Sequence, residues 1–88
     1  MNDNWEQIEQ ILNKRISDAW ELHEMHKMEQ IPELKGVWEY QINLNFAIIE
    51  AILDNKLIIA TAYTNEITRS TKAAMQYRQF IIDNTQTR

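Results

Sequence analysis

The sequence predicts an all-α protein of two or three long amphipathic helices, and its shortage of turn-forming residues is the first reason. The 88 residues include one glycine and one proline, where average usage would give about six and about four. Sheets use glycine where φ becomes positive and proline where a hydrogen-bonded ladder stops. A chain with so few of either residue needs few tight turns and should run in long helices.

Helical periodicity over residues 3–30 is the second reason. Glu6 stands three residues after Asp3, which is the spacing of an N-terminal capping box. Charged and amide side chains occupy most positions outside one apolar stripe. We therefore predict a helix over 3–30, followed by a loop over 31–36. The members of the stripe recur at intervals of three and four: Trp5, Ile8, Leu12, Ile16, Ala19, Trp20 and His23.

Residues 37–54 satisfy two patterns at once. Apolar and polar side chains alternate over 38–48, which is the spacing of a strand. The single valine of the chain and the absence of glycine after Gly36 favour a helix instead. We predict a helix over 37–54, with an α+β fold containing a strand or hairpin within 37–63 as the alternative. The residues that fit the helical template are Trp38, Ile42, Phe46, Ile49 and Leu53.

Two parallel stripes predict a third helix over 56–84, with a frayed tail over 85–88. One stripe is apolar, and the other consists of threonines spaced three, four and three residues apart. Asn55 tolerates the left-handed conformation found after helix ends, which favours a tight turn before this helix. The alternative is one continuous helix over 38–84, which would need a second chain to pack against. The threonines are Thr61, Thr64, Thr68 and Thr71.

A chain of this length makes one domain, 1–88, with little margin of buried surface. Residues 46–62 are apolar in nearly every direction around a helix, and a helix of that kind belongs in an interior. A three-helix bundle offers no such position, so we predict that dimerisation completes it. The predicted homodimer interface consists of Phe46, Ile49, Ile52, Leu53 and Ile59.

Charge and composition exclude several classes of function. The net charge is −4, which opposes binding to phosphate backbones, so a nucleic-acid partner is not expected. The chain has no cysteine for a disulfide, a thiol nucleophile or a cysteine-based zinc site. Its acidic, polar beginning is unlike a signal peptide, and charged residues interrupt its apolar stretches. We therefore expect a cytoplasmic protein that does not enter a membrane.

The chain offers little for catalysis. His23 and His26 are the only histidines, and neither stands three residues after a glutamate, as the di-metal helical bundles require. No glycine-rich loop is present to cradle a phosphate. Arg15 and Lys27 invite comparison with the all-helical chorismate mutases, which have a similar length and are dimeric. That family also draws cationic side chains from its second helix, and no arginine lies in 37–55. We predict no enzyme, no metal and no cofactor.

A short run in the last helix carries a second resemblance. Residues 61–65, Thr-Ala-Tyr-Thr-Asn, are followed by Ile67. The run is similar to a stretch of the enterocin-type bacteriocin immunity proteins, which are small helical bundles that tend to be longer and more basic. The resemblance covers seven residues, implies a bacteriocin-immunity-like helical protein as one alternative, and carries no functional residue with it.

Aromatic and methionine side chains point to a binding role, because they offer a large contact area at low entropic cost. Met25 and His26 end the first helix, close to Trp38 across the expected loop. Trp38 either closes the end of the bundle or anchors a partner there. With Arg69 and Lys72 of the last helix, these residues form the predicted partner-binding set.

The predicted function is that of a non-enzymatic, acidic helical binding protein. Such a protein regulates, sequesters or inhibits a macromolecular protein partner, as many small bacterial and phage inhibitors and regulators do. The alternative is an oligomeric helical protein that holds a small anionic, nucleotide-like ligand between protomers. That ligand would contact Arg69, Lys72 or Arg78 and stack on tyrosine.

Overall fold

A computed structural model describes residues 3–86 and consists of three antiparallel helices. They are α1 (Asp3–Met28), α2 (Pro32–Leu53) and α3 (Leu57–Gln86), and no strand occurs in this part of the chain. The predicted all-α fold is therefore confirmed, and the strand or hairpin considered within 37–63 is wrong. The buried side chains over 38–53 lie along one side of α2, as the helical spacing predicts. They do not fall on alternate residues, as the apolar–polar alternation of a strand would require.

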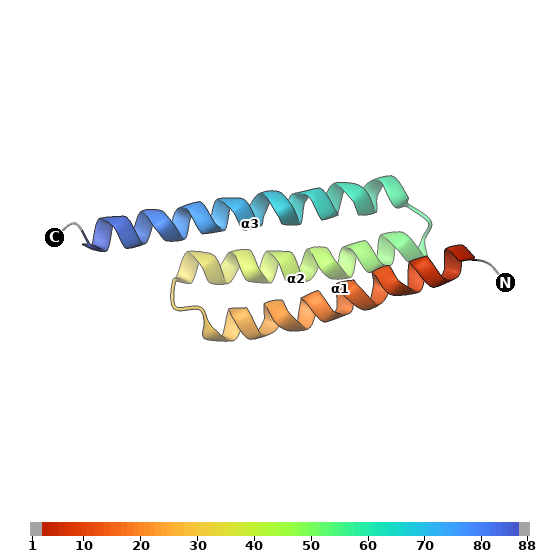
Figure 1. The fold of residues 1–88 in the computed structure, drawn as a ribbon, viewed down its shortest axis with the longest axis horizontal. Helices are drawn as coiled ribbons and strands as arrows, with labels where there is room; N and C mark the ends of the chain where they lie inside the picture. The colour runs from red at the N-terminus through yellow and green to blue at the C-terminus, as the bar shows by residue number, and fades with distance from the viewer. Residues whose placement is uncertain (1–2, 87–88) are drawn as a thin grey trace.

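The middle helix, α2, holds the fold together. It packs against both α1 and α3, whereas no Cα atom of α1 lies within 8 Å of a Cα atom of α3 in the described helices. The molecule measures 62 × 23 × 17 Å. Figure 1 shows α2 between its two neighbours, with the last turns of α3 extending past the connection between α1 and α2. A long, thin arrangement of this kind leaves much apolar surface uncovered.

The connection between α1 and α2 is shorter than predicted. The loop over 31–36 is wrong, because α2 begins at Pro32 and α1 ends at Met28. Proline suits the first turn of a helix, where its missing N–H has no partner to lose. The carbonyl of Ile31 accepts the backbone N–H groups of Leu34 at 3.0 Å and Lys35 at 3.1 Å. The first turn of α2 is thereby closed around Pro32.

The connection between α2 and α3 is the tight turn predicted at Asn55. Asn55 has a φ of 62°, which is the left-handed conformation that asparagine tolerates after a helix. The Asp54 N–H donates to the Glu50 carbonyl at 2.9 Å, and the Lys56 N–H donates to the Ala51 carbonyl at 2.7 Å. These bonds satisfy the last carbonyls of α2, and the alternative of one continuous helix over 38–84 is wrong.

Threonine hydroxyls of α3 bond to backbone carbonyls of their own helix. The hydroxyl of Thr61 donates to the Leu57 carbonyl at 2.9 Å, and Thr64 donates to the carbonyl four residues before it at the same distance. Such bonds satisfy the hydroxyls but slightly destabilise a helix, so α3 depends on its packing against α2. Thr85 repeats the contact on the Ile81 carbonyl. The tail predicted over 85–88 is therefore wrong at 85–86, and 87–88 lie outside the described residues.

The core is small and divides into two clusters. One joins all three helices through Leu22, Leu34, Trp38 and Ala74. The other joins α2 to α3 near their connecting turn, and four of the nine buried apolar residues in the described chain are alanines. Since alanine contributes little apolar area, hydrophobic burial within this chain is limited. The second cluster consists of Ile48, Ala51 and Ala60.

A buried polar layer separates the two clusters. The Gln41 side-chain amide donates to the hydroxyls of Ser70 at 2.7 Å and Thr71 at 2.9 Å. The Asn45 amide donates to the backbone carbonyl of Gln41 at 2.9 Å. Asn45 is fully buried, and its oxygen Oδ1 has no hydrogen-bond partner among the described residues. The layer fixes α3 against α2, at the cost of one unsatisfied acceptor.

Candidate functional site

Trp38, predicted as a partner anchor, belongs to the core. Its side chain is 1% exposed and packs with Leu34 and Ala74. Its indole Nε1 donates a hydrogen bond to the Glu29 oxygen Oε1 at 2.8 Å. Trp38 therefore closes the end of the bundle, and its assignment as a partner-binding residue is wrong. The sequence pattern placed it correctly on the apolar side of α2 but did not show which neighbour covers that side.

Glu29 is the polar centre of this end of the bundle. It accepts the backbone N–H groups of Gln30 at 3.2 Å and Ile31 at 3.3 Å, and it pairs with Arg78 of α3. Burial raises the pKa of Glu29, but the hydrogen bonds from Trp38 and Arg78 outweigh burial and lower the pKa from 4.5 to about 2. The ionised carboxylate thus joins the α1–α2 connection to α2, through Trp38, and to α3, through Arg78.

The other predicted partner-binding residues do not form one site. Met25 and His26 lie in the last turns of α1, and the His26 Nε2 atom lies 3.8 Å from the Glu39 carboxylate. Arg69 and Lys72 lie on α3 and are exposed. One pair thus lies on α1 and the other on α3, and no Cα atom of α1 comes within 8 Å of a Cα atom of α3.

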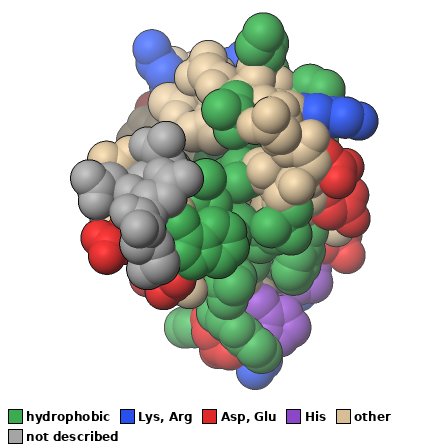
Figure 2. Space-filling view, turned by 90° about the vertical axis from the view of Figure 1, so that its right-hand side faces the viewer, with side chains coloured by type: hydrophobic (Ala, Val, Ile, Leu, Met, Phe, Trp, Pro, Cys, Tyr) green, Lys and Arg blue, Asp and Glu red, His purple; other side chains and the backbone are tan. Residues whose placement is uncertain are grey.

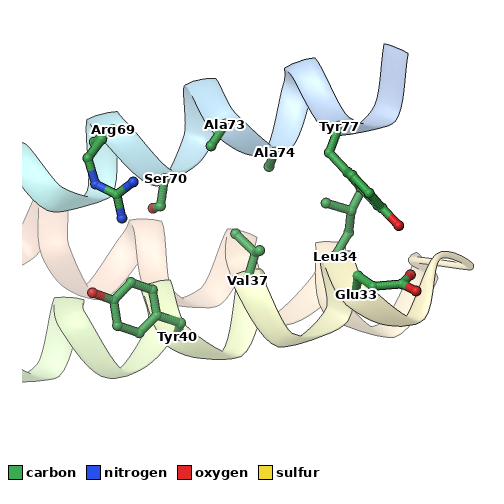
Figure 3. Close-up of a pocket in the computed structure, with 9 residues that line it drawn as sticks. All are labelled: Glu33, Leu34, Val37, Tyr40, Arg69, Ser70, Ala73, Ala74 and Tyr77. Carbon is green, nitrogen blue, oxygen red and sulfur yellow. The ribbon is translucent and has the colours of Figure 1, made fainter. Parts of the chain in front are cut away.

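A groove between α2 and α3 brings together part of the predicted anion site. Figure 3 shows Arg69 and Tyr40 at one end of this α2–α3 groove and Tyr77 with Glu33 at the other. Small side chains such as Ala73 form its wall on α3, and its volume is about 340 Å³. The groove therefore presents one cation and two aromatic rings, together with an opposing carboxylate.

The cation of the α2–α3 groove, Arg69, is paired with an exposed carboxylate, that of Glu66. The Arg69 Nε atom donates to Glu66 at 2.7 Å, and the Tyr40 hydroxyl donates to the same carboxylate at 2.8 Å. The bonds from Arg69 and then Tyr40 lower the pKa of Glu66 to about 2. The hydrogen bond to Glu66 raises the pKa of Tyr40. Arg69 is thus already paired with a carboxylate that stays ionised.

A second groove, between α1 and α2, is apolar and aromatic. Trp20 of α1 is 66% exposed and Phe46 of α2 is 54% exposed, and both line this α1–α2 groove. The ring of His23 meets the Trp20 ring edge-on, with centroids 6.1 Å apart and an interplanar angle of 85°. The groove has a volume of about 410 Å³. Its lining residues are Ile16, Ala19, Trp20, His23, Ile42 and Phe46.

Apolar surface continues from this groove to the end of the bundle. Leu53 follows Phe46 by two helical turns, so it lies on the same side of α2, and it is 63% exposed. Beyond the turn, Leu57 is exposed and Ile58 is 88% exposed. Figure 2 looks at the end where α2 turns into α3 and shows apolar side chains gathered there. Large apolar side chains are thus uncovered along one side and one end.

The predicted dimer residues are divided between different surfaces. Phe46 lines the α1–α2 groove, whereas Ile52 lines a separate cleft bordered by all three helices. Ile49 is half-buried, and Leu53 and Ile59 are exposed. Homodimerisation itself stays a prediction. The structure does not bring these five residues onto one face.

The described residues contain neither a metal-binding cluster nor a helix suited to cross a membrane. No group of three or more histidine and acidic side chains over 3–86 is arranged to hold a metal ion. None of the three described helices combines the length and the apolar character that a membrane crossing requires. Neither Trp20 nor Glu29, the central residues of the groove and of the buried network, was singled out as functional by the sequence pattern.

Comparison with known proteins does not add a relative. No family model, no curated protein and no solved structure matches the chain.

Proposed function

We propose that this chain is a cytoplasmic, non-enzymatic binding protein that regulates, sequesters or inhibits a macromolecular protein partner. We place the contact at the α1–α2 groove. The observation that carries the proposal is the pair of exposed aromatic side chains, Trp20 and Phe46, on facing walls of one apolar groove. Aromatic residues in such positions supply much of the binding energy at protein interfaces.

The balance of buried and exposed apolar side chains supports this proposal. Nine apolar residues of the described chain are buried, and fifteen large ones are exposed. Scattered apolar side chains are ordinary on protein surfaces, but contiguous apolar patches mark interaction sites. Here three of the exposed residues, Ile16, Trp20 and Phe46, line one groove together.

The chemistry of the groove supports binding over catalysis. His23 is the one lining residue with an ionisable side chain, and its ring packs against the edge of Trp20. Nucleophilic catalysis places a nucleophile and a base within hydrogen-bond reach, and the groove lining pairs His23 with no nucleophilic side chain. The groove offers area and shape, which are the properties that a protein partner uses.

Affinity capture with matched variants tests the proposal. The doubly substituted variant Trp20→Ser/Phe46→Ser removes both aromatic walls of the groove. A control, Met75→Ser/Phe80→Ser, removes two similarly exposed apolar side chains from α3. We expect the wild type and the control to retain the same partner from the native host and the groove variant to lose it. If the groove variant still retains the partner and the control variant loses it, the proposal is contradicted.

A small anionic ligand in the α2–α3 groove is the second candidate, because Arg69, Tyr40 and Tyr77 line that groove together. A ligand bound only to the folded chain raises its melting temperature. Under this alternative, nucleotides should raise the melting temperature of the wild type but not of Arg69→Gln. The ligand would have to displace Glu66 from Arg69, which disfavours this candidate relative to the first.

A further inference from the structure

Resting on the proposed function, we infer that the occupant of the α1–α2 groove is a basic amphipathic α-helix of the partner. Such a helix presents an apolar stripe to the groove and lysine or arginine side chains to its edges. The shape of the groove points to a helix, and the charges beside it point to a basic one.

The apolar side of α2 that enters the groove has helical spacing. Ile42 and Phe46 line the groove, and Ile49 and Leu53 continue the same side of α2, at intervals of four, three and four residues. At 1.5 Å per residue this line is about 16 Å long, which is three helical turns. A partner helix that docks in a groove uses anchors at the same intervals. Trp20 and Ile16 of α1 form the other wall over part of that length.

Charge is distributed unevenly between the two sides of the molecule. Residues 3–53, which contain α1 and α2, carry ten acidic and four basic side chains, whereas residues 54–86 carry three acidic and four basic ones. The α1–α2 groove therefore lies on the acidic side of the protein. A cationic partner is attracted to such a surface before any apolar contact forms.

Four glutamates border the groove itself. On α1, Glu9 precedes Ile16 by seven residues and Glu24 follows Trp20 by four, so each shares a side of the helix with a groove residue. On α2, two glutamates share a side of the helix with the groove residue Phe46. Glu39 precedes Phe46 by seven residues, and Glu50 follows it by four.

Two of these carboxylates are unpaired. Glu24 lies 3.7 Å from Lys27, and Glu39 lies beside His26. Glu9 and Glu50 are exposed, and no basic side chain of the described residues lies within ion-pair distance of either. Because α1 and α2 are antiparallel, these two glutamates lie toward the same end of the groove.

The same charges disfavour other occupants. Lys27 and Lys35 lie toward the opposite end of the groove, next to the α1–α2 connection, and Lys14 and Arg15, which precede Ile16, are paired with Asp18. Two copies of this chain that met at the groove with their helices running in the same direction would bring carboxylates against carboxylates, and like charges across an interface are unfavourable. Nucleic acid would be repelled by the same groups. A basic helix meets both the apolar floor and the free carboxylates.

Three designed peptides test the inference. Each has about 18 residues, enough to cover three turns with flanking residues, and an identical leucine stripe. The polar positions are filled by lysine, glutamine or glutamate. Labelled peptides are titrated with the intact chain and followed by fluorescence anisotropy. We expect the lysine peptide to bind about tenfold or more tightly than the glutamate peptide, and salt to reduce this difference.

Matched variants locate the effect. Glu9→Gln/Glu50→Gln should abolish most of the preference for lysine. The control Glu21→Gln/Asp83→Asn removes the same charge at positions that share no side of a helix with a groove residue, and it should keep the preference. Phe46→Asp should prevent the lysine peptide from binding while the circular dichroism spectrum stays helical.

Other outcomes overturn the inference. Equal binding of the three peptides, lost in Phe46→Asp, would show an apolar groove without charge selection, which leaves the proposed function standing. Sedimentation velocity that shows a dimer dispersed by Phe46→Asp would assign the groove to a second copy. If no peptide binds, the basic helix is excluded, and capture with the Trp20→Ser/Phe46→Ser variant separately decides the proposed function.

Discussion

The indole N–H of Trp38 donates to the carboxylate of Glu29 at 2.8 Å, and the two residues join α2 to the α1–α2 connection. Arg78 pairs with the same carboxylate oxygen from α3. One buried anion thus bonds to all three segments that meet at this end. The consequence for function is that Trp38 is not available to a partner, whereas Trp20 of α1 is 66% exposed.

Replacing Trp38 by alanine should destabilise the protein. Loss of a core tryptophan costs about 3–5 kcal/mol, which is a large fraction of the stability of a small domain. Chemical denaturation of Trp38→Ala and of Trp38→Phe separates the contribution of packing from that of the hydrogen bond. Phenylalanine keeps most of the packing and removes the N–H donor. An unchanged denaturation midpoint in the alanine variant would contradict the assignment of Trp38 to the core.

Stability should depend on pH through Glu29. Its pKa is lowered from 4.5 to about 2, so the stability it supplies is present above pH 4.5 and is lost as the pH falls toward 2. Glu29→Gln should cost on the order of 3 kcal/mol at neutral pH. The difference from the wild type should shrink below pH 4.5, as measured by denaturation at several pH values. A difference that stays constant down to pH 2 would contradict the role given to the ionised carboxylate.

Asn45→Leu should stabilise the protein. The Asn45 oxygen Oδ1 is buried without a hydrogen-bond partner, and an unsatisfied buried polar group costs about 1–3 kcal/mol. Leucine removes that cost and has a similar size. Thermal unfolding of this variant should show a higher midpoint than the wild type. A lower midpoint would mean that the asparagine oxygen is satisfied in solution.

Gln41→Leu is the comparison for Asn45→Leu and should have the opposite effect. The Gln41 amide supplies hydrogen bonds to Ser70 and Thr71. Its removal takes away donors from hydroxyls on α3, so the melting temperature should fall. Equal changes in melting temperature in the two variants would contradict the different roles given to Gln41 and Asn45.

Tyr40 should titrate at higher pH than an ordinary tyrosine. The hydrogen bond to Glu66 raises its pKa, because ionisation of the phenol would lose that bond and bring two negative charges together. Ultraviolet titration of the wild type and of Glu66→Gln compares the two states. The substitution should lower the pKa of Tyr40, and a titration curve that does not change would exclude the contact in solution.

The helices could be predicted from the sequence because their signals are local. The shortage of glycine and proline, the threonine stripe and Asn55 act over a few residues, and each proved informative. The loop over 31–36 was placed wrongly for a local reason as well. The predicted loop ends at Gly36, the single glycine of the sequence, but Gly36 lies inside α2, which begins at Pro32.

The site could not be predicted in the same way, because it depends on how the helices pack. Glu29 bonds to Trp38 nine residues away and to Arg78 forty-nine residues away, and no spacing in the sequence relates the three. Periodicity placed Trp38 and Trp20 in apolar patterns of their helices, but burial of one and exposure of the other follow from the position of α2 between its neighbours.

Calorimetric titration of Trp20→Ala with the captured partner tests the central claim, that the α1–α2 groove is the binding surface. Phe80→Ala, an exposed aromatic on α3, is the control, and thermal unfolding of both variants is measured in parallel. We predict that Trp20→Ala weakens binding by about 2 kcal/mol or more and leaves the melting temperature close to that of the wild type, while Phe80→Ala binds normally. Wild-type affinity in Trp20→Ala would contradict the claim.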